Sequence, residues 1–493
     1  MNLSLSKLQE QDILRITLRF AKRRKTKLYL VGGILRDIFL NREKANIDFD
    51  FCLKRGAIGF AGKLAKELRA GFVVLDKEHG ACRLVKRIKD KGYTLDFTDF
   101  RGKTLEEDLL HRDFTINSLA LELENVFKNE NLDKLLIDPY EGRKDLKLKT
   151  IRIVNIKAFD EDPLRILRAF SLSAIFGFRI EKDTLKLIRA KRDKLAKVSS
   201  ERIRDELFKI LDRPNSYEYL VELDKLKILR NIIPEIEIMR GVKQGPYHHL
   251  DVWQHTLETV RQLENLIGEL KRNKEVSDYL NQDISSERRR LSLIKLGALL
   301  HDIGKPQAMF REDGKTKFHG HERIGLEITQ DVAKRLRLSN DELESLKKMV
   351  LWHLRPGYLA DNEEITARAT FRYFRDTAQE GASTLLLSIA DQRATRGPLT
   401  SRKSRLHHEK VVLGLIKEYF KRKEEPKLVR LITGDDLKKK FGLEPSSLIG
   451  KTLSEIEELQ AIGKIKTKRE ALKVSKKLIT KLLSRKVGGG NKK

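Results

Sequence analysis

The pattern of apolar and polar positions changes along the chain and divides it into two kinds of sequence. In the first part, short apolar runs such as KLYLV, FVVLD, CRLVKRI and YTLDFTDF alternate with segments such as GFAGKLAKEL. Short apolar runs bounded by glycine or charged residues predict strands, and GFAGKLAKEL has the spacing of a helix. We therefore expect an α/β region that ends near residue 148.

After Ile156 the strand pattern almost disappears. Stretches such as DPLRILRAFSLSAIFGF place leucine and isoleucine at helical spacing, so we expect the rest of the chain to be all-helical. The polar stretch at 271–290, KRNKEVSDYLNQDISSERRR, predicts a surface insertion. With 493 residues, the chain is also longer than a single hydrophobic core supports, which predicts several domains.

Two aspartates stand close together in the expected strand NIDFDF. Asp48 and Asp50 are two positions apart, so their side chains project from the same face of a strand. Like charges at that distance repel each other, and a divalent cation between them makes the arrangement favourable. Magnesium prefers carboxylate oxygens together with substrate phosphates. The alternative is an exposed edge strand that carries ordinary surface acids.

A glycine turn lies just upstream, in LVGGILRD. Gly32 and Gly33 allow backbone amides to approach a triphosphate closely, and Arg36 on the following helix can hold a phosphate oxygen. A glycine turn, a helix with an arginine and a strand with paired aspartates form a rarer combination than any one of them. Together they predict a nucleotide site.

The charge balance and the cysteine count narrow the class of protein. The formal net charge of +30 favours a polyanionic partner such as nucleic acid, although a highly charged solvated surface is the alternative. Cys52 and Cys82 are too few for a disulfide framework and indicate a reducing, cytoplasmic environment. The first twenty residues are amphipathic rather than signal-like, and no apolar stretch is long enough to span a bilayer.

Five successive motifs resemble those of one enzyme family. They are LVGGILRD, IDFDF, LEEDLLHRDFTINSLAL, IDPYEGRKDLKLKTIRIV and EDPLRILRAFSLSAIFGF. They look like the class II tRNA nucleotidyltransferase and poly(A) polymerase family, and most like its bacterial CC-adding members. The resemblance implies a head with the polymerase-β-type nucleotidyltransferase fold, in which Asp48 and Asp50 are the catalytic carboxylates that bind two Mg²⁺ ions. Asp96 is a candidate third carboxylate.

The same resemblance assigns residues that select the nucleotide. Arg112, Asp113 and Asn117 match the family's ribose and phosphate contacts, and Arg168 can reach the triphosphate. Asp162 and Arg165 are three positions apart, which predicts that they share a helix face. There a carboxylate and a guanidinium can imitate a complementary base edge that accepts cytosine or adenine and rejects uracil and guanine.

A second set of residues resembles the HD phosphohydrolase superfamily. His255, the adjacent His301 and Asp302, then His319, His321, His353 and Asp391 follow the superfamily's order. Imidazoles and carboxylates from several helices can bind one or two transition-metal ions. We therefore expect a second metal site formed by His255, His301, Asp302 and Asp391. The alternative is a helical body that keeps these residues for packing and hydrogen bonding.

The C-terminal segment resembles the tRNA-binding end of bacterial family members. Its lysines would meet backbone phosphates, and they are Lys438, Lys439, Lys440, Lys464, Lys466 and Lys468. We expect a head at 1–148, a helical neck at 149–225, an HD-type body at 226–400 and this tail at 401–493. The expected partners are the tRNA acceptor end and CTP or ATP, with no obligatory protein partner.

The length of one connection favours one activity within the family. Few residues separate YTLDFTDFRG from LEEDLLHRDF, whereas the resemblance implies a longer polar loop there in members that add the terminal A. We therefore predict an enzyme that adds CC to tRNA from CTP and releases pyrophosphate. Full CCA addition and poly(A) synthesis are the alternatives within the family. A phosphohydrolase whose head only recognises nucleotides, and a non-catalytic RNA-binding protein, are the alternatives outside it.

Overall fold

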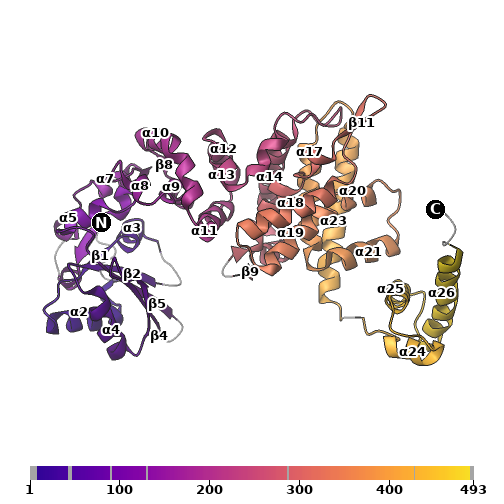
Figure 1. Ribbon diagram of the computed structural model, residues 1–493, viewed down its shortest axis with the longest axis horizontal. Coiled ribbons are helices and arrows are strands. Elements are labelled where there is room, and N and C mark those ends of the chain that lie inside the picture. The colour runs from indigo at the N-terminus through magenta and orange to yellow at the C-terminus, as the bar shows by residue number, and fades with distance from the viewer. Residues whose placement is uncertain are drawn as a thin grey trace. The chain divides into compact units, whose positions relative to one another are not determined.

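The computed structural model describes residues 8–42, 47–88, 91–128, 132–285, 288–426 and 428–488. Within it the chain forms two compact units (Figure 1). Unit 1 comprises residues 1–213 and 222–232, and unit 2 comprises residues 214–221 and 233–493. The four-part division expected from the sequence is finer than this pair of units.

Unit 1 contains a six-stranded mixed sheet in the order β3-β4-β5-β2-β1-β6. The strands are β1 (Tyr29–Val31), β2 (Ile47–Leu53), β3 (Gly71–Asp76), β4 (Ala81–Ile88), β5 (Lys91–Asp99) and β6 (Ala120–Glu122). The central pair β2 and β5 is parallel, and its neighbours pair antiparallel. The predicted α/β head is confirmed.

The sheet has one aromatic face and one polar face because side chains alternate along β2. Phe49 and Phe51 are buried, and Phe51 stacks on Phe97 of β5 with ring centroids 4.8 Å apart. Helices α2 (Asp12–Arg23) and α4 (Ala57–Leu68) cover this face and add Phe20 and Phe60 to the same core (Figure 1). The alternation directs the aspartates of β2 away from this core.

Short helices surround the polar face, and longer ones follow the sheet in sequence. They include α3 (Gly33–Phe39), α5 (Leu105–Leu110), α7 (Gly142–Lys147), α8 (Ala158–Glu161), α9 (Arg165–Phe176), α10 (Lys182–Lys191) and α11 (Ser200–Leu211). Helix α9 packs on α11, and a two-residue parallel pairing joins β7 (Thr150–Ile151) to β8 (Arg179–Ile180). The helical pattern predicted after Ile156 is confirmed here.

Unit 2 is mainly helical. Its principal helices are α14 (Val252–Glu269), α15 (Lys274–Leu280), α16 (Arg290–Leu300), α18 (His321–Arg335), α19 (Asn340–Trp352), α21 (Ala367–Thr377), α22 (Gly381–Ala394) and α23 (Arg402–Glu424). Two small hairpins interrupt them, β9–β10 at 283–289 and β11–β12 at 310–317. The sequence did not predict these hairpins, because strands of two or three residues leave no periodic pattern.

The stretch at 271–290 is not the surface insertion that its polarity predicted. Helix α15 buries Tyr279, whose hydroxyl donates to the Gln379 carbonyl at 2.9 Å. Arg290 is also buried, lies over the Tyr279 ring at 4.4 Å and pairs with Glu380. Polar residues that satisfy one another in the core give the same composition as a solvated segment, which is why the prediction was wrong.

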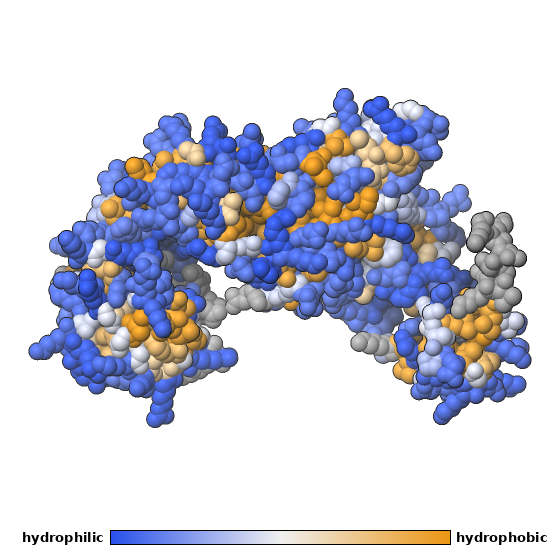
Figure 2. Space-filling model, viewed as in Figure 1, coloured by the Kyte–Doolittle hydropathy of each residue, from blue (hydrophilic) through white to orange (hydrophobic). Residues whose placement is uncertain are grey.

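The C-terminal helices α24 (Gly434–Phe441), α25 (Ser447–Ala461) and α26 (Lys468–Gly488) have a hydrophobic cluster of their own. Glu458 of α25 is buried and receives Arg368 and Arg372 of α21, with an Arg372 Nε to Glu458 Oε2 distance of 2.7 Å. Hydrophilic residues cover most of the face in Figure 2. Among the described residues, no helix combines the length and apolarity needed to cross a membrane.

Candidate functional site

The polar face of the unit 1 sheet opens into a cleft of about 840 Å³. We call it the head cleft. The head and nucleotide residues singled out from the sequence all line it: Gly32, Gly33, Arg36, Asp48, Asp50, Asp96, Arg112, Asp113, Asn117, Asp162, Arg165 and Arg168. Its volume lies within the range of small-molecule sites. Residues separated by up to 136 positions therefore meet in one place.

Three carboxylates share one face of the sheet. Asp50 of β2 is in parallel register with Asp96 of β5, and Asp48 is paired with Thr94 two positions before. Registered partners in neighbouring strands project to the same face, so Asp48, Asp50 and Asp96 point together into the cleft. This set of oxygen donors fits a hard divalent cation such as Mg²⁺.

Charge crowding is visible at Asp50. Burial raises the pKa of the Asp50 carboxyl, and the charges of Asp96 and Asp48 raise it further. Arg112 offsets part of this effect. A carboxylate held in its ionised form against its surroundings gains free energy when a cation arrives, so the electrostatics also fit a metal ion.

The glycine turn lies directly against these acids. Gly32 has φ of +75°, and a Cβ built there would lie 3.1 Å from Asp50 Oδ2 and 3.2 Å from Arg112 Nη1. Both the positive φ and the crowded space favour glycine. The turn between β1 and α3 thus places backbone beside the carboxylates, as the sequence predicted.

A continuous polar chain joins α3 to α9 across the cleft. Arg36 Nη1 donates to Asn117 Oδ1 at 2.6 Å, and Asn117 Nδ2 donates to Asp113 Oδ1 at 3.0 Å. Arg168 Nε lies 3.1 Å from Asp113 Oδ2. Burial acts to raise the pKa of Asp113, but Arg168 and Asn117 hold it below its usual value. The carboxylate is therefore ionised and fixes both neighbours.

Asp162 and Arg165 do not share a helix face, so that prediction was wrong. Asp162 is extended, with φ of −145° and ψ of 99°, and α9 begins at Arg165. The cause is Pro163, because a residue before proline is disfavoured in the helical region. Both side chains still line the head cleft.

Both members of this pair have partners. Asp162 Oδ2 lies 2.7 Å from Arg202 Nη2 of α11. Arg165 Nη2 donates to the His111 carbonyl at 2.6 Å, and its Nη1 donates to the Ala158 carbonyl at 3.3 Å. Because a guanidinium has five donors and a carboxylate about four acceptor positions, each retains capacity for a base edge.

Sequence reasoning missed two arginines of the cleft. Arg202 lies on a helix interpreted as structural, and Arg83 lies on β4, where its guanidinium meets Asp96. Alternating polarity places Arg83 on one face of its strand, but the sequence does not give the register between β4 and β5. No signal in the sequence could have joined Arg83 to Asp96.

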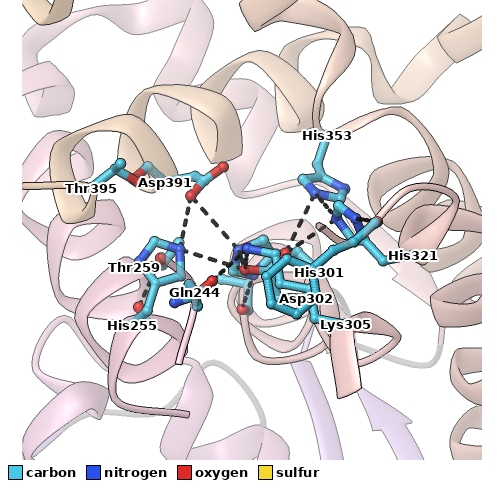
Figure 3. A network of polar contacts seen from close by, with 12 residues as sticks. Gln244, His255, Thr259, His301, Asp302, Lys305, His321, His353, Asp391 and Thr395 are labelled. Atoms are coloured by element: carbon cyan, nitrogen blue, oxygen red, sulfur yellow. Dashed lines mark hydrogen bonds and ion pairs between the residues drawn. The ribbon is translucent and has the colours of Figure 1, made fainter. Parts of the chain in front are cut away.

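Unit 2 holds a second concentration of metal-ligand side chains, the His–Asp cluster (Figure 3). Its members are His255, His301, Asp302, His321, His353 and Asp391. They form two groups, His255 with His301 and Asp391, and Asp302 with His321 and His353, and in each group the ligand atoms lie within 4.8 Å of one another. The four residues predicted from the sequence are thus brought together with two further histidines. His319 lies outside, against the Phe310 ring.

Three of the imidazoles are oriented by backbone carbonyls. Nδ1 of His301 lies 2.8 Å from the Ala298 carbonyl. The corresponding distances are 2.8 Å for His321 and 2.7 Å for His353. Because a carbonyl only accepts, Nδ1 carries the proton, and in the neutral ring the Nε2 lone pair is left for a ligand bond.

Asp302 sits between the two groups. Its Oδ2 lies 3.2 Å from His301 Nε2, and its Oδ1 lies 3.4 Å from His321 Nε2 and 3.7 Å from His353 Nε2. Oδ1 is buried without a hydrogen-bond partner. Lone pairs of a carboxylate and two imidazoles that face one another fit a cation, so the donor set suits a transition metal.

Cations surround this carboxylate. Burial acts to raise the pKa of Asp302, but His301 and Lys305 hold it well below its ordinary value. Lys305 Nζ lies 2.6 Å from Asp302 Oδ2 and donates to Gln244 Oε1 at 2.7 Å. Burial, with the charges of His301 and His321, lowers the pKa of His353 to about 3, so this imidazole is a neutral lone-pair donor.

The predicted tail lysines surround the ends of α24 and α26. Lys439, Lys440, Lys464, Lys466 and Lys468 are exposed. Two of the six predicted lysines have acidic partners: Lys438 lies 3.0 Å from Asp435, and Lys468 lies 2.6 Å from Asp436. An exposed cation can exchange such a partner for a phosphate at little cost.

Comparison with known proteins places these sites in a family. Residues 28–152 match a family model for the poly(A) polymerase head domain, residues 177–239 one for a probable RNA- and SrmB-binding site of polymerase A, and residues 252–396 one for the HD domain. An A-adding tRNA nucleotidyltransferase from Deinococcus radiodurans is 30% identical over 451 residues, which cover 90% of this chain and 93% of that protein. This chain belongs to the tRNA nucleotidyltransferase family.

Relatives within the family differ in the nucleotide named. A CC-adding tRNA nucleotidyltransferase from Thermus thermophilus is 29% identical and is covered over 91% of its length by 90% of this chain. A CC-adding enzyme from Synechocystis is 27% identical over 93% of its length and 91% of this chain. The chain is therefore a nucleotidyltransferase of the group that adds CCA, CC or A, and the family is metal-dependent.

Solved structures agree on the fold. The Thermotoga maritima CCA-adding enzyme complexed with tRNA superposes with a TM-score of 0.60 at 23% identity, over 96% of this chain and 95% of that one. A complex of a CCA-adding enzyme with CTP superposes with a TM-score of 0.61 at 22% identity, over 94% of this chain and 93% of that one. The predicted fold class, an α/β nucleotidyltransferase head followed by a helical HD body, is confirmed.

Proposed function

We propose that this nucleotidyltransferase adds two cytidines to the 3′ end of tRNA, taking CTP and releasing pyrophosphate. The observation that carries the proposal is the head cleft. It gathers three carboxylates on one sheet face, a glycine turn beside them and four predicted arginines around them. This is the arrangement that transfer of a nucleotidyl group to a hydroxyl requires.

The carboxylates carry the metal-dependent part of the reaction. Asp48 and Asp50 would hold Mg²⁺, with Asp96 as the third carboxylate. Mg²⁺ bound there favours ionisation of a hydroxyl and neutralises a leaving pyrophosphate. The 3′ oxygen of tRNA attacks the α-phosphorus of CTP, and the bond from that phosphorus to the bridging oxygen of the pyrophosphate breaks.

The remaining cleft residues bind and orient the nucleotide. Gly32 and Gly33 admit the triphosphate, and its oxygens are held by Arg36, Arg112 and Arg168. Asp113 and Asn117 take the ribose hydroxyls. The cytosine edge is read by Asp162 and Arg165, after Arg202 shares or releases the Asp162 carboxylate. The ionised state of Asp113 and the free donors of Arg165 support these roles.

The choice of CC over CCA rests on one short connection. Strand β5 ends at Asp99 and α5 begins at Leu105, so residues 100–104 join them. A connection of this length cannot act as the long lever that would reshape one pocket from cytosine to adenine. The pocket should therefore stay matched to the smaller base.

Primer extension at nucleotide resolution tests this proposal. We expect tRNA that lacks its 3′ end to gain two cytidines with CTP, and tRNA that ends in CC to stay unchanged with ATP. Addition of a terminal A at a rate comparable to C would show a CCA-adding enzyme. A alone, added only to tRNA ending in CC, would show an A-adding enzyme, the activity in the name of the Deinococcus relative.

The tRNA would bind along the C-terminal lysines, and the whole chain would work in four parts. We propose a head at 1–148, a neck at 149–225, an HD-type body at 226–400 and a tRNA-binding tail at 401–493. Lys439, Lys440, Lys464 and Lys466 are exposed without a carboxylate partner among the described residues, which leaves their charge for backbone phosphates.

The His–Asp cluster favours a second activity, hydrolysis of a phosphodiester or a terminal phosphate. The observation is Asp302, whose two oxygens face two separate groups of histidines. We expect phosphate release or cyclic-phosphate opening with Mn²⁺, Ni²⁺ or Mg²⁺, lost on changing His301 and Asp302 to alanine. His319→Ala is the matched control, because His319 lies outside the cluster. No turnover with any of these metals would leave the cluster a structural metal site.

A further inference from the structure

Arg83 of β4 forms a two-toothed ion pair with the third carboxylate of the head cleft. Its Nε donates to Asp96 Oδ1 at 2.7 Å, and its Nη2 donates to Asp96 Oδ2 at 2.8 Å. Both residues line the cleft, and the side chains retain 44% and 24% of their exposure. A parallel fork of this kind uses both oxygens in the plane in which a carboxylate would also meet a metal ion.

The sheet register fixes who can compete for Asp96. Arg83 is the direct antiparallel partner of Asp96, and Asp50 is its direct parallel partner on the other side. All three side chains therefore share the polar face. The pKa of Arg83 is raised by its hydrogen bonds to Asp96 and also by the charges of Asp48 and Asp50, so the guanidinium is the local counter-charge of all three acids.

We propose that Arg83 is a positioning residue that occupies Asp96 in the nucleotide-free enzyme and moves to the nucleotide's phosphates when a metal ion takes that carboxylate. The inference rests on the proposed nucleotidyl transfer. A carboxylate whose two oxygens both accept from one guanidinium must give up at least one of these bonds to ligate a metal. Arg83 then becomes a free cation at the moment when a triphosphate enters the cleft.

This exchange couples the two ligands. Metal binding releases the arginine, and the released arginine strengthens nucleotide binding; by linkage, nucleotide binding strengthens metal binding equally. The half-exposed Arg83 loses little by moving, since exposed ion pairs contribute modestly to stability. The carboxylate cluster is also protected from its own repulsion while no metal is present.

Metal binding without nucleotide tests the first half of the exchange. Free Mn²⁺ is followed by its electron paramagnetic resonance signal in the full chain, and the ions bound by Asp50→Asn, which report the His–Asp cluster, are subtracted. Arg83→Met should bind Mn²⁺ about two- to fivefold tighter than wild type, because the competitor is gone. Arg87→Met, on the same strand and face, is the matched control and should match wild type.

A double variant and a conservative variant make the test specific. In an Asp96→Asn background, Arg83→Met should no longer change Mn²⁺ affinity. Arg83→Lys keeps the charge but not the fork, so its Mn²⁺ affinity should lie between wild type and Arg83→Met. Mn²⁺ affinity of Arg83→Met equal to that of Arg87→Met, or an increase that survives in the Asp96→Asn background, would overturn the proposal.

Nucleotide binding tests the second half. The factor by which Mn²⁺ tightens CTP binding should be smaller in Arg83→Met than in Arg87→Met, and an equal factor contradicts the transfer of Arg83 to the phosphates. Primer extension by wild type keeps the two proposals apart. If wild type adds no nucleotide, the proposed function fails, while the Mn²⁺ comparison still decides whether Arg83 competes for Asp96.

Discussion

The head cleft and the His–Asp cluster bring carboxylates together in opposite electrostatic settings. In the head, Asp48, Asp50 and Asp96 share one sheet face, and mutual repulsion adds to the burial that raises the pKa of Asp50. In the cluster, Asp302 lies among imidazoles and a lysine that hold its pKa well below the ordinary value. One site is short of positive charge, and the other already contains it.

The difference follows from the elements that build each site. Residues two apart on a strand, and partners in adjacent strands, place like charges on one face of a sheet. Helices that converge from several directions bring unlike groups together, as α14, α18 and α22 do around Asp302. The open cleft can exchange ligands with solvent, whereas the buried cluster keeps what it holds.

The largest expected effect separates the two sites by activity. Changing Asp48 and Asp50 to alanine should reduce nucleotide addition on the order of a thousandfold or more, because the metal-binding oxygens are removed. Asp302→Asn should leave nucleotide addition within about twofold of wild type. Primer extension measures both. A loss of nucleotide addition in Asp302→Asn comparable to that in the head variant would show that the sites are not independent.

The same substitution should change stability in opposite directions at the two sites. Asp302→Asn leaves His301 and Lys305 without their counter-charge, and should cost about 3–5 kcal/mol of unfolding free energy in metal-free protein. Asp50→Asn removes a repelled charge, and should raise the Tm of metal-free protein by about 2–4 °C. Thermal unfolding at pH 8 in the presence of a chelator measures both.

The pH dependence of these shifts has a definite sign. Because the pKa of folded Asp50 is raised, its charge costs stability above the unfolded pKa, and the gain from Asp50→Asn should shrink as the pH falls through the folded pKa. The pKa of folded Asp302 is lowered, so its stabilisation should persist in mild acid and be lost only well below the ordinary carboxyl range. Equal signs at pH 8 would contradict the comparison.

A smaller effect concerns base selection in the open cleft. Asp162→Asn removes the acceptor proposed for the exocyclic amine of cytosine, and should reduce discrimination against UTP by about 5- to 150-fold. The ratio of kcat/KM for CTP and UTP measures it. Glu201→Gln, which changes an exposed acid near the start of α11, is the matched control. Unchanged discrimination would show that another residue reads the base.

The smallest expected effect lies in the tail. Changing the exposed Lys464 and Lys466 to glutamine should lower the dependence of tRNA affinity on salt by roughly one unit of logarithmic slope per contact. Lys186→Gln is a charge-matched control, because Lys186 lies in unit 1 and pairs with Asp183 at 2.8 Å. Equal slopes for the tail variant and wild type would remove these lysines from the RNA-binding surface.

The sequence by itself determined the strands, the glycine turn and most residues of both sites. A period of two in NIDFDF is sufficient to place Asp48 and Asp50 together, and ordered motifs were sufficient to identify the family. These inferences succeed because they depend on local geometry, which a few neighbouring residues fix.

Only the tertiary structure decided which distant groups neutralise one another. The fork between Arg83 and Asp96 depends on the register of two strands, and Arg202 reaches Asp162 only because α11 packs on α9. The polar stretch at 271–290 is buried because Arg290 finds Tyr279 and Glu380. A charge's free energy depends on its partners in space, and spacing along the chain does not give them.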